Sequence, residues 1–381
     1  MGSRDLFDFY SMGVKMGYEI DFLEVGENSK SGDAIALRFG NFDGTREEQK
    51  VVIIDGGYKV SGENLVNLVK NHYETDYVDL VVLTHPDADH ASGLKVVLDE
   101  LNVGELWMHK PWEHNIGKAS LFKDGRVTDN SIGERLKKSL DTAYSLYELA
   151  IEKDIRVQEP FAGLGAFNNN LQVIGPAYEY YNELLLDFTK MPEKAAITSE
   201  SSFFLNPITT VAKKALSWVT DHWSIDSIVD EGDETSAQNN SSVILQLTVD
   251  GKRLLFTGDA GRQALTYAAD CLGDRSSLLP LQMMQIPHHG SFRNIGPTVL
   301  DQLVGPKVAI GTPPHFAAIV SCAPEGEPKH PSRKVTNAFK RRGADVAKTA
   351  GKSVRYFTSD APKRDGYTAI DTVEFYDLVE E

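Results

Sequence analysis

The sequence contains little cysteine and no long apolar run. Two of its 381 residues are cysteines, Cys271 and Cys322, and neither lies in a paired metal-binding motif. Two isolated cysteines cannot build a disulfide framework, so a reducing cytoplasm is the expected location. No stretch approaches the roughly 20 apolar residues that a membrane helix requires. Residues 1–18 also lack the apolar centre of a signal peptide. The sequence therefore predicts no membrane association.

Basic charge is scarce over the chain as a whole but concentrated in one segment. The formal net charge is −16, which argues against non-specific coating of nucleic acid, because that function needs a broad basic surface. Residues 329–364, however, contain eleven Lys and Arg residues against two acidic residues, Asp345 and Asp360. This segment favours an anionic partner at one place, although such runs more often line the solvent-facing side of a helix.

Hydrophobic residues make up 41% of the chain, enough for one large domain with insertions or for two small domains. Apolar runs and alternation predict strands over residues 20–25, 34–39, 51–54, 78–83, 106–108, 171–174, 243–247, 253–257, 283–286, 308–311, 354–357 and 372–376. Helical spacing predicts helices over residues 64–72, 91–101, 133–154, 261–271 and 331–339. Residues 177–234 are less regular. They are predicted to form an insertion or lid with helices over 178–191 and 210–218, and with aromatic side chains in the core.

The most informative motif is Thr84-His85-Pro86-Asp87-Ala88-Asp89-His90. It comes directly after the predicted buried strand 78–83, and Pro86 should break the chain into a loop. The side chains of His85, Asp87, Asp89 and His90 can converge there and offer nitrogen and oxygen ligands to a hard or borderline divalent cation. A solvated polar loop is the competing interpretation, but four such residues directly after a buried strand favour a metal site.

Further polar clusters also lie next to predicted strands or helices. They are Asn239 with Asn240, Asp259, His288 with His289, and His330. Each has a simpler explanation when taken alone, as a turn, a capped loop or a helix cap. Taken together they predict that several strands deliver ligands to one shared edge of a sheet.

These motifs resemble those of the metallo-β-lactamase fold superfamily. The stretch Thr84–His90 resembles the H-x-[H/D]-x-D-H signature, and Phe256-Thr257-Gly258-Asp259 resembles the strand that carries the bridging aspartate. One branch is similar in more detail, namely the hydrolase domain of competence DNA-uptake (ComEC-type) proteins and their stand-alone relatives. The stretches that carry this second resemblance are Asn239–Val243, Pro287–Ser291 and His330–Ser332.

The resemblance implies an α+β fold, a four-layer αβ/βα sandwich over residues 18–381, with a largely helical insertion at 177–234. It also implies two divalent metal ions, Zn²⁺ or Mn²⁺. Metal 1 would use His85 and Asp87, metal 2 would use Asp89, His90 and His288, and Asp259 would bridge them. Asp87 replaces the second histidine of the superfamily, and Asn239 or Asn240 replaces its third-motif histidine. One metal is therefore expected to be labile, and the added oxygen ligands favour Mn²⁺.

The reaction implied is phosphodiester hydrolysis by a metal-activated hydroxide, with nucleic acid as the expected anionic substrate. Asp87 or Asp89 would orient the hydroxide, and Asn240 would bind the substrate or a metal-bound water. His289 or His330 would protonate the leaving oxygen or hold a phosphate oxygen. Two alternatives stay open. One is a small-molecule hydrolase for a phosphocholine ester, cyclic nucleotide or lactone, with residues 177–234 as its lid. The other is a catalytically weak regulatory module with a protein partner in a multi-protein system.

Overall fold

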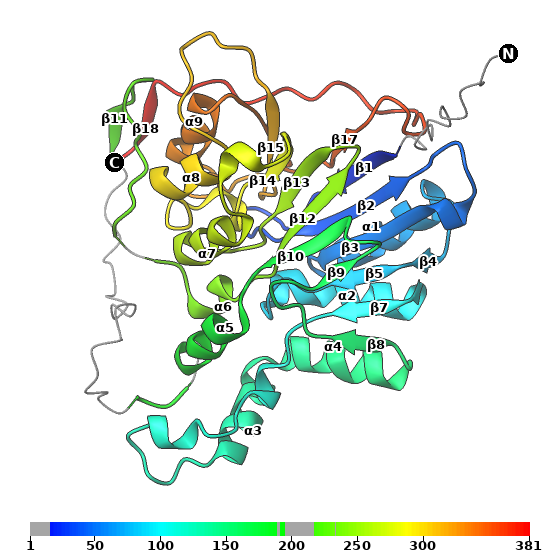
Figure 1. Ribbon diagram of the computed structural model, residues 1–381, viewed down its shortest axis with the longest axis vertical. Helices are drawn as coiled ribbons and strands as arrows, with labels where there is room; N and C mark the ends of the chain where they lie inside the picture. Colours follow the sequence, from blue (N-terminus) through cyan, green and yellow to red (C-terminus); the bar gives the residue numbers. More distant parts are fainter. Residues whose placement is uncertain (1–15, 189–190, 195–216, 233) are drawn as a thin grey trace, which may run out of the picture.

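Two seven-stranded sheets form the framework of the computed structural model, which describes residues 16–188, 191–194, 217–232 and 234–381 (Figure 1). The first sheet has the order β17-β1-β2-β3-β5-β7-β8. Its strands are β1 (Gly17–Phe22), β2 (Ala34–Gly40), β3 (Gln49–Gly56), β5 (Leu80–Val82), β7 (Glu105–Trp107), β8 (Arg156–Gln158) and β17 (Val354–Phe357). The second sheet has the order β16-β15-β14-β13-β12-β10-β9. Its strands are β9 (Gly165–Ala166), β10 (Leu171–Gly175), β12 (Ile244–Val249), β13 (Lys252–Phe256), β14 (Leu281–Gln285), β15 (Phe316–Val320) and β16 (Ala344–Lys348).

The two sheets pack face to face, and helices cover their outer faces (Figure 1). One apolar cluster between the sheets joins side chains such as Ile20 and Val52 of the first sheet to Leu245 and Phe256 of the second. The outer face of the first sheet is covered by α1 (Lys59–Asn71), α2 (Ala88–Glu100) and α4 (Asp141–Glu152), and that of the second by α7 (Arg262–Leu272), α8 (Pro297–Leu303) and α9 (Arg333–Arg341). Strands buried on both faces require near-continuous apolar sequence, as in residues 51–54. The predicted α+β, four-layer αβ/βα sandwich is thus confirmed.

Three glycines hold α2 close to the first sheet. Gly93 of α2 faces Gly62 of α1 and Gly56 of β3, and a Cβ atom at Gly93 would lie 1.9 Å from the Gly56 carbonyl oxygen. Only hydrogen atoms at these positions permit so close an approach. The contact positions polar side chains as well, because the first turn of α2 carries Asp89 and His90, and β3 carries Asp55 near its end.

Several predicted elements differ from those observed. The predicted helix 133–154 is two helices, α3 (Asp129–Ser139) and α4, separated at Leu140, whose φ of −116° and ψ of 41° are not helical. Apolar spacing continues across the break, so periodicity alone could not reveal the change of direction. The predicted strand 308–311 is instead an exposed loop. Pro313 and Pro314 come after it, and the next strand, β15, begins only at Phe316.

The remaining elements are short. Residues 372–376 form no strand, although the Val373 N–H donates to the Val346 carbonyl. Within 177–234 the structure shows α5 (Tyr178–Leu184) and β11 (Trp218–Thr220), whereas residues 210–216 of the second predicted helix lie outside the described residues. The other elements are α6 (Ala237–Asn240), the strands β4 (Tyr77–Val78), β6 (Asn102–Val103) and β18 (Leu378–Glu380), and the 3-10 turns η1 (Arg46–Glu48), η2 (Pro111–Glu113), η3 (Ala119–Leu121), η4 (Leu185–Asp187), η5 (Arg275–Ser277) and η6 (His288–Gly290). Among the described residues, no helix combines the length and apolar composition needed to cross a membrane.

The basic segment 329–364 is largely tied into the fold by ion pairs. The side chains of Arg341 and Arg342 are fully buried, and they pair with Asp221 and Asp226. In all, six of the eleven basic residues pair with carboxylates, namely Arg333, Arg341, Arg342, Lys348, Arg355 and Arg364. Much of the local positive charge therefore stabilises contacts within the chain rather than facing a partner.

Candidate metal centre

The predicted ligands meet at one edge of the sandwich, where strands of both sheets end. His85 lies after β5, Asp259 after β13, and His288 and His289 after β14. Asp89 and His90 lie in the first turn of α2. The packing of the two sheets thus brings together clusters that lie as far apart in the chain as residues 85 and 289.

Asp259 lies at the middle of this cluster, between four imidazoles. Its Oδ2 atom is 3.7 Å from His85 Nε2 and 3.5 Å from His288 Nε2. Its Oδ1 atom is 3.6 Å from His90 Nε2 and 3.8 Å from His289 Nε2. These separations are too long for good hydrogen bonds. They do suit ligand atoms that share an ion, because bonds of about 2.1 Å in tetrahedral geometry place neighbouring ligand atoms roughly 3.4 Å apart.

The other two predicted aspartate ligands, Asp87 and Asp89, lie on opposite sides of the cluster and define two halves. Asp87 Oδ2 lies 3.8 Å from His85 Nε2, whereas Asp89 Oδ2 lies 4.0 Å from His289 Nε2. We call the group His85, Asp87 and His288 the first half, and the group Asp89, His90 and His289 the second half. Asp259 presents one oxygen to each half.

The doublet His288-His289 differs from its expected assignment. The family resemblance placed His288 with Asp89 and His90 and gave His289 a catalytic role, but His289 is the imidazole that faces Asp89. Both residues have left-handed backbone conformations, with φ of 48° and 54°. Their consecutive side chains consequently reach opposite oxygens of Asp259. His288 therefore faces the same oxygen of Asp259 as His85, and His289 faces the same oxygen as His90.

Among the residues that the structure describes, the inner faces of these side chains have no hydrogen-bond partners. The buried Nε2 atoms of His85, His90 and His289 lack partners, as does Oδ1 of Asp259. Buried polar atoms without partners are rare, because each forfeits its bonds to water. Here four of them converge, and ligand atoms of Asp89, His90 and His289 all lie within 4.8 Å of one another. Nitrogen and carboxylate donors in this arrangement fit divalent cations such as Zn²⁺ or Mn²⁺.

The electrostatics of the cluster also favour cations. Burial acts to lower the pKa of His90, but the carboxylates of Asp259 and Asp55 outweigh it and hold that pKa well above its usual value. Burial acts to raise the pKa of Asp259, but His288, His289 and His90 hold it well below its usual range. The site thus stabilises positive charge next to an ionised Asp259.

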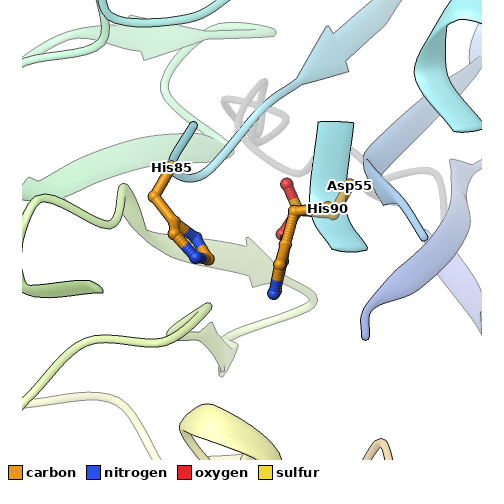
Figure 2. Close-up of side chains that lie close together, drawn as sticks. All are labelled: Asp55, His85 and His90. Atoms are coloured by element: carbon orange, nitrogen blue, oxygen red, sulfur yellow. The ribbon is translucent and has the colours of Figure 1, made fainter. Parts of the chain in front are cut away.

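Asp55 contacts a predicted ligand, although it is not among the predicted site residues. Its Oδ2 atom lies 2.7 Å from His90 Nδ1, and its two oxygens accept hydrogen bonds from the Thr84 N–H and hydroxyl. Figure 2 shows His85 and His90 projecting side by side, with Asp55 against the ring of His90. A carboxylate on Nδ1 directs Nε2 toward Asp259 and raises the basicity of the ring. A single aspartate at the end of β3 has no spacing signal that distinguishes it from a turn residue.

The other predicted site residues lie at the border of the cluster. Asn239 Nδ2 lies 3.3 Å from both ring nitrogens of His288, whereas Asn240 Oδ1 accepts a hydrogen bond from the Gly261 N–H before α7. The ring of His330 lies 5.5 Å from that of His288 and 6.2 Å from that of His289. Burial, together with the neighbouring His289 and His288, lowers the pKa of His330 to about 3. A direct role for Asn240 stays a prediction.

Comparison with known families gives a match over most of the chain. The family model of the metallo-beta-lactamase superfamily matches residues 46–306 of the 381. That span contains all the predicted metal ligands, and it leaves only His330 among the predicted site residues outside it. None of the curated protein sequences is similar enough to this chain to count as a match.

Solved structures give partial likenesses. A Thermotoga maritima protein described as a metallo-beta-lactamase is 12% identical, with a TM-score of 0.30 over 64% of this chain and 78% of that one. Unliganded yeast PDE1 is 10% identical, with a TM-score of 0.44 over 90% of this chain and 100% of that one. A diphosphatase of the PhnP family is 10% identical, with a TM-score of 0.33 over 90% and 98%. At these values the likeness extends neither to substrate nor to mechanism.

Proposed function

Because the chain belongs to the metallo-beta-lactamase superfamily of metal-dependent hydrolases, we propose that it hydrolyses phosphodiesters at the centre around Asp259. The observation that carries the proposal is the position of Asp259 between four imidazole Nε2 atoms at 3.5–3.8 Å, two for each carboxylate oxygen. In this proposal the residues of the first half and those of the second half would each hold one divalent cation, and Asp259 would contribute one carboxylate oxygen to each half.

The two cations would supply a water of lowered pKa and would neutralise negative charge that develops on phosphate oxygens. The protein contributes the geometry. Asp55 holds the His90 ring in place, and the Asn294 side-chain oxygen, 2.8 Å from His288 Nδ1, does the same for His288. Asp87 is 39% exposed and Asp89 is 31% exposed, so both reach the solvent side of the centre, where they can orient an attacking water.

His330 has a proposed role in binding substrate. Its ring lies next to both histidines of the doublet and is closer to His288. A neutral imidazole carries one N–H donor, which suits a hydrogen bond to a non-bridging phosphate oxygen. We therefore assign His330 to holding the phosphate rather than to protonating the leaving group.

Two substrate classes remain candidates. The sequence resemblance to hydrolase domains of competence DNA-uptake proteins supports a nuclease. The internal ion pairs of the basic segment support a smaller phosphodiester, because six of its eleven cationic side chains already meet carboxylates of the same chain. A cyclic nucleotide or a phosphodiester of similar size needs less cationic surface than a nucleic acid strand.

The test is a substrate panel with Mn²⁺ or Zn²⁺, applied to the metal-loaded protein. The panel contains bis(p-nitrophenyl) phosphate, cyclic nucleotides, and single- and double-stranded DNA and RNA. We expect cleavage of at least one phosphodiester, and loss of both bound metal and cleavage in Asp259→Ala.

Asp79→Asn is the matched control. Asp79 precedes β5, at the end of the strand opposite His85, and pairs with Arg46 and Lys50. This variant loses a carboxylate from the same sheet without touching the centre and should retain cleavage. A wild-type protein that binds metal but leaves the whole panel uncut would refute phosphodiester hydrolysis. A wild-type protein that binds no metal would favour the regulatory module instead.

A further inference from the structure

Asp33 is a second carboxylate that the sequence motifs did not indicate. It precedes β2, and its side chain is 2% exposed. One ligand atom each of Asp33, Asp259 and His289 lie within 4.8 Å of one another. Asp33 Oδ2 also lies 3.9 Å from His90 Nδ1. The residue therefore borders the second half of the centre from the side of the first sheet.

A glutamine ties Asp33 to the turn that carries Asp259. The Gln285 Nε2 group donates a 3.0 Å hydrogen bond to Asp33 Oδ2. The Gln285 Oε1 atom accepts hydrogen bonds from the N–H groups of Thr257 and Gly258, at 2.9 and 3.2 Å. One β14 side chain thus fixes the distance between the loop before β2 and the turn after β13, although the two belong to different sheets.

The other oxygen of Asp33 has no hydrogen-bond partner in the part of the chain that the structure describes. Oδ1 is buried and lacks a hydrogen bond, as Asp259 Oδ1 and His289 Nε2 do. A buried carboxylate is costly unless it is hydrogen-bonded at both oxygens or meets a cation. Burial raises the pKa of Asp33, and the carboxylates of Asp259 and Asp55 act in the same direction, whereas His289 and His90 act to lower it.

We propose that Asp33 is an additional carboxylate ligand of the cation in the second half. This inference rests on the proposed two-metal centre and deepens it. The second half then has the carboxylates of Asp33, Asp89 and Asp259 with the imidazoles of His90 and His289. Three oxygen donors and two nitrogen donors suit a cation of higher coordination number, such as Mn²⁺, better than a tetrahedral Zn²⁺. The second half is the firmly occupied one, and the first half is the labile one.

The experiment measures metal binding without substrate. Wild type, Asp33→Asn and the control Asp79→Asn are stripped of metal, and Mn²⁺ is titrated in competition with a chelator, with bound metal counted by mass spectrometry. Asparagine keeps the shape of the side chain, and its amide oxygen can still accept the Gln285 hydrogen bond. We expect Asp33→Asn to bind the tighter Mn²⁺ at least about 10-fold more weakly, and Asp79→Asn to bind it as wild type does.

A second measurement separates a ligand from a structural residue. Thermal unfolding of the metal-stripped proteins should give Asp33→Asn a midpoint equal to or above that of wild type, because the substitution removes a buried charge. Wild-type Mn²⁺ affinity in Asp33→Asn, or a metal-stripped midpoint lowered in that variant, would overturn the assignment, as would a wild type that binds no metal. Failure of phosphodiester cleavage by a metal-loaded wild type would instead refute the proposed function and leave the role of Asp33 standing.

Discussion

His109 provides a test of how burial controls stability in this fold. It lies after β7, and neither of its ring nitrogens has a hydrogen-bond partner among the described residues. Its ring lies 4.2 Å from that of Tyr181 and 4.7 Å from that of Phe161. Burial lowers the pKa of His109 to about 3, although Glu159, 3.9 Å away, acts to raise it. The folded protein therefore holds a neutral imidazole where the unfolded chain titrates near 6.5.

The difference between these two pKa values sets the direction of the pH effect. Above pH 6.5 both states are neutral and the contribution of His109 to stability is complete. As the pH falls below that value, only the unfolded chain takes up the proton, so stability is lost progressively until the pKa of the folded state is reached. Each pH unit costs about 1.4 kcal/mol, which amounts to about 2 kcal/mol at pH 5. That is a substantial part of a typical free energy of unfolding of about 5–15 kcal/mol.

The perturbation is His109→Phe, which keeps an aromatic ring between Tyr181 and Phe161 but removes the titrating group. The assay is urea unfolding of the metal-stripped wild type and variant at pH 8, 7, 6 and 5. At pH 8 the difference between the free energies of unfolding of wild type and variant measures repacking alone, because His109 is neutral there in both the folded and the unfolded state. We expect that difference to move in favour of the variant by about 2 kcal/mol between pH 8 and pH 5. A difference that stays constant over this range would refute the reasoning.

Two further predictions concern the framework and the orientation of the ligands. Gly93→Ala should lower the free energy of unfolding by about 1–3 kcal/mol, since its Cβ would lie 1.9 Å from the Gly56 carbonyl oxygen. Gly125→Ala, where a Cβ would meet no atom of the described residues within 4 Å, should have little effect, and equal effects of the two substitutions in urea unfolding would contradict the packing argument. Asp55→Asn should weaken metal binding by about 10–100-fold in a chelator competition, because its amide would place an N–H group against His90 Nδ1. Unchanged affinity in this variant would show that the Asp55 carboxylate does not orient His90.

Part of the candidate site is encoded locally and could be predicted from the sequence. The stretch 84–90 places four potential ligands within seven residues, and strand ends at Asp259 and His288 are marked by apolar runs that stop at polar residues. Apolar runs also predict most strands, because strands buried on both faces must be apolar at nearly every position. The layered fold class is predicted by the same runs together with the family resemblance.

Other features depend on contacts between distant parts of the chain. Asp33 and Asp55 are not among the predicted site residues. They lie beside the predicted ligands only because the loop before β2 and the end of β3 lie beside α2 and the turn after β13. In the sequence the basic segment resembles a cationic surface, but the fold places Asp221 and Asp226 against Arg341 and Arg342.

The sequence by itself determined the ligand types and the apolar strands that carry them, because both are properties of neighbouring residues. Tertiary structure decided how His288 and His289 divide between the two halves. Two consecutive left-handed residues turn their side chains to opposite oxygens of Asp259. Sequence spacing carries no information on that choice, since it depends on backbone angles imposed by the packing of the two sheets.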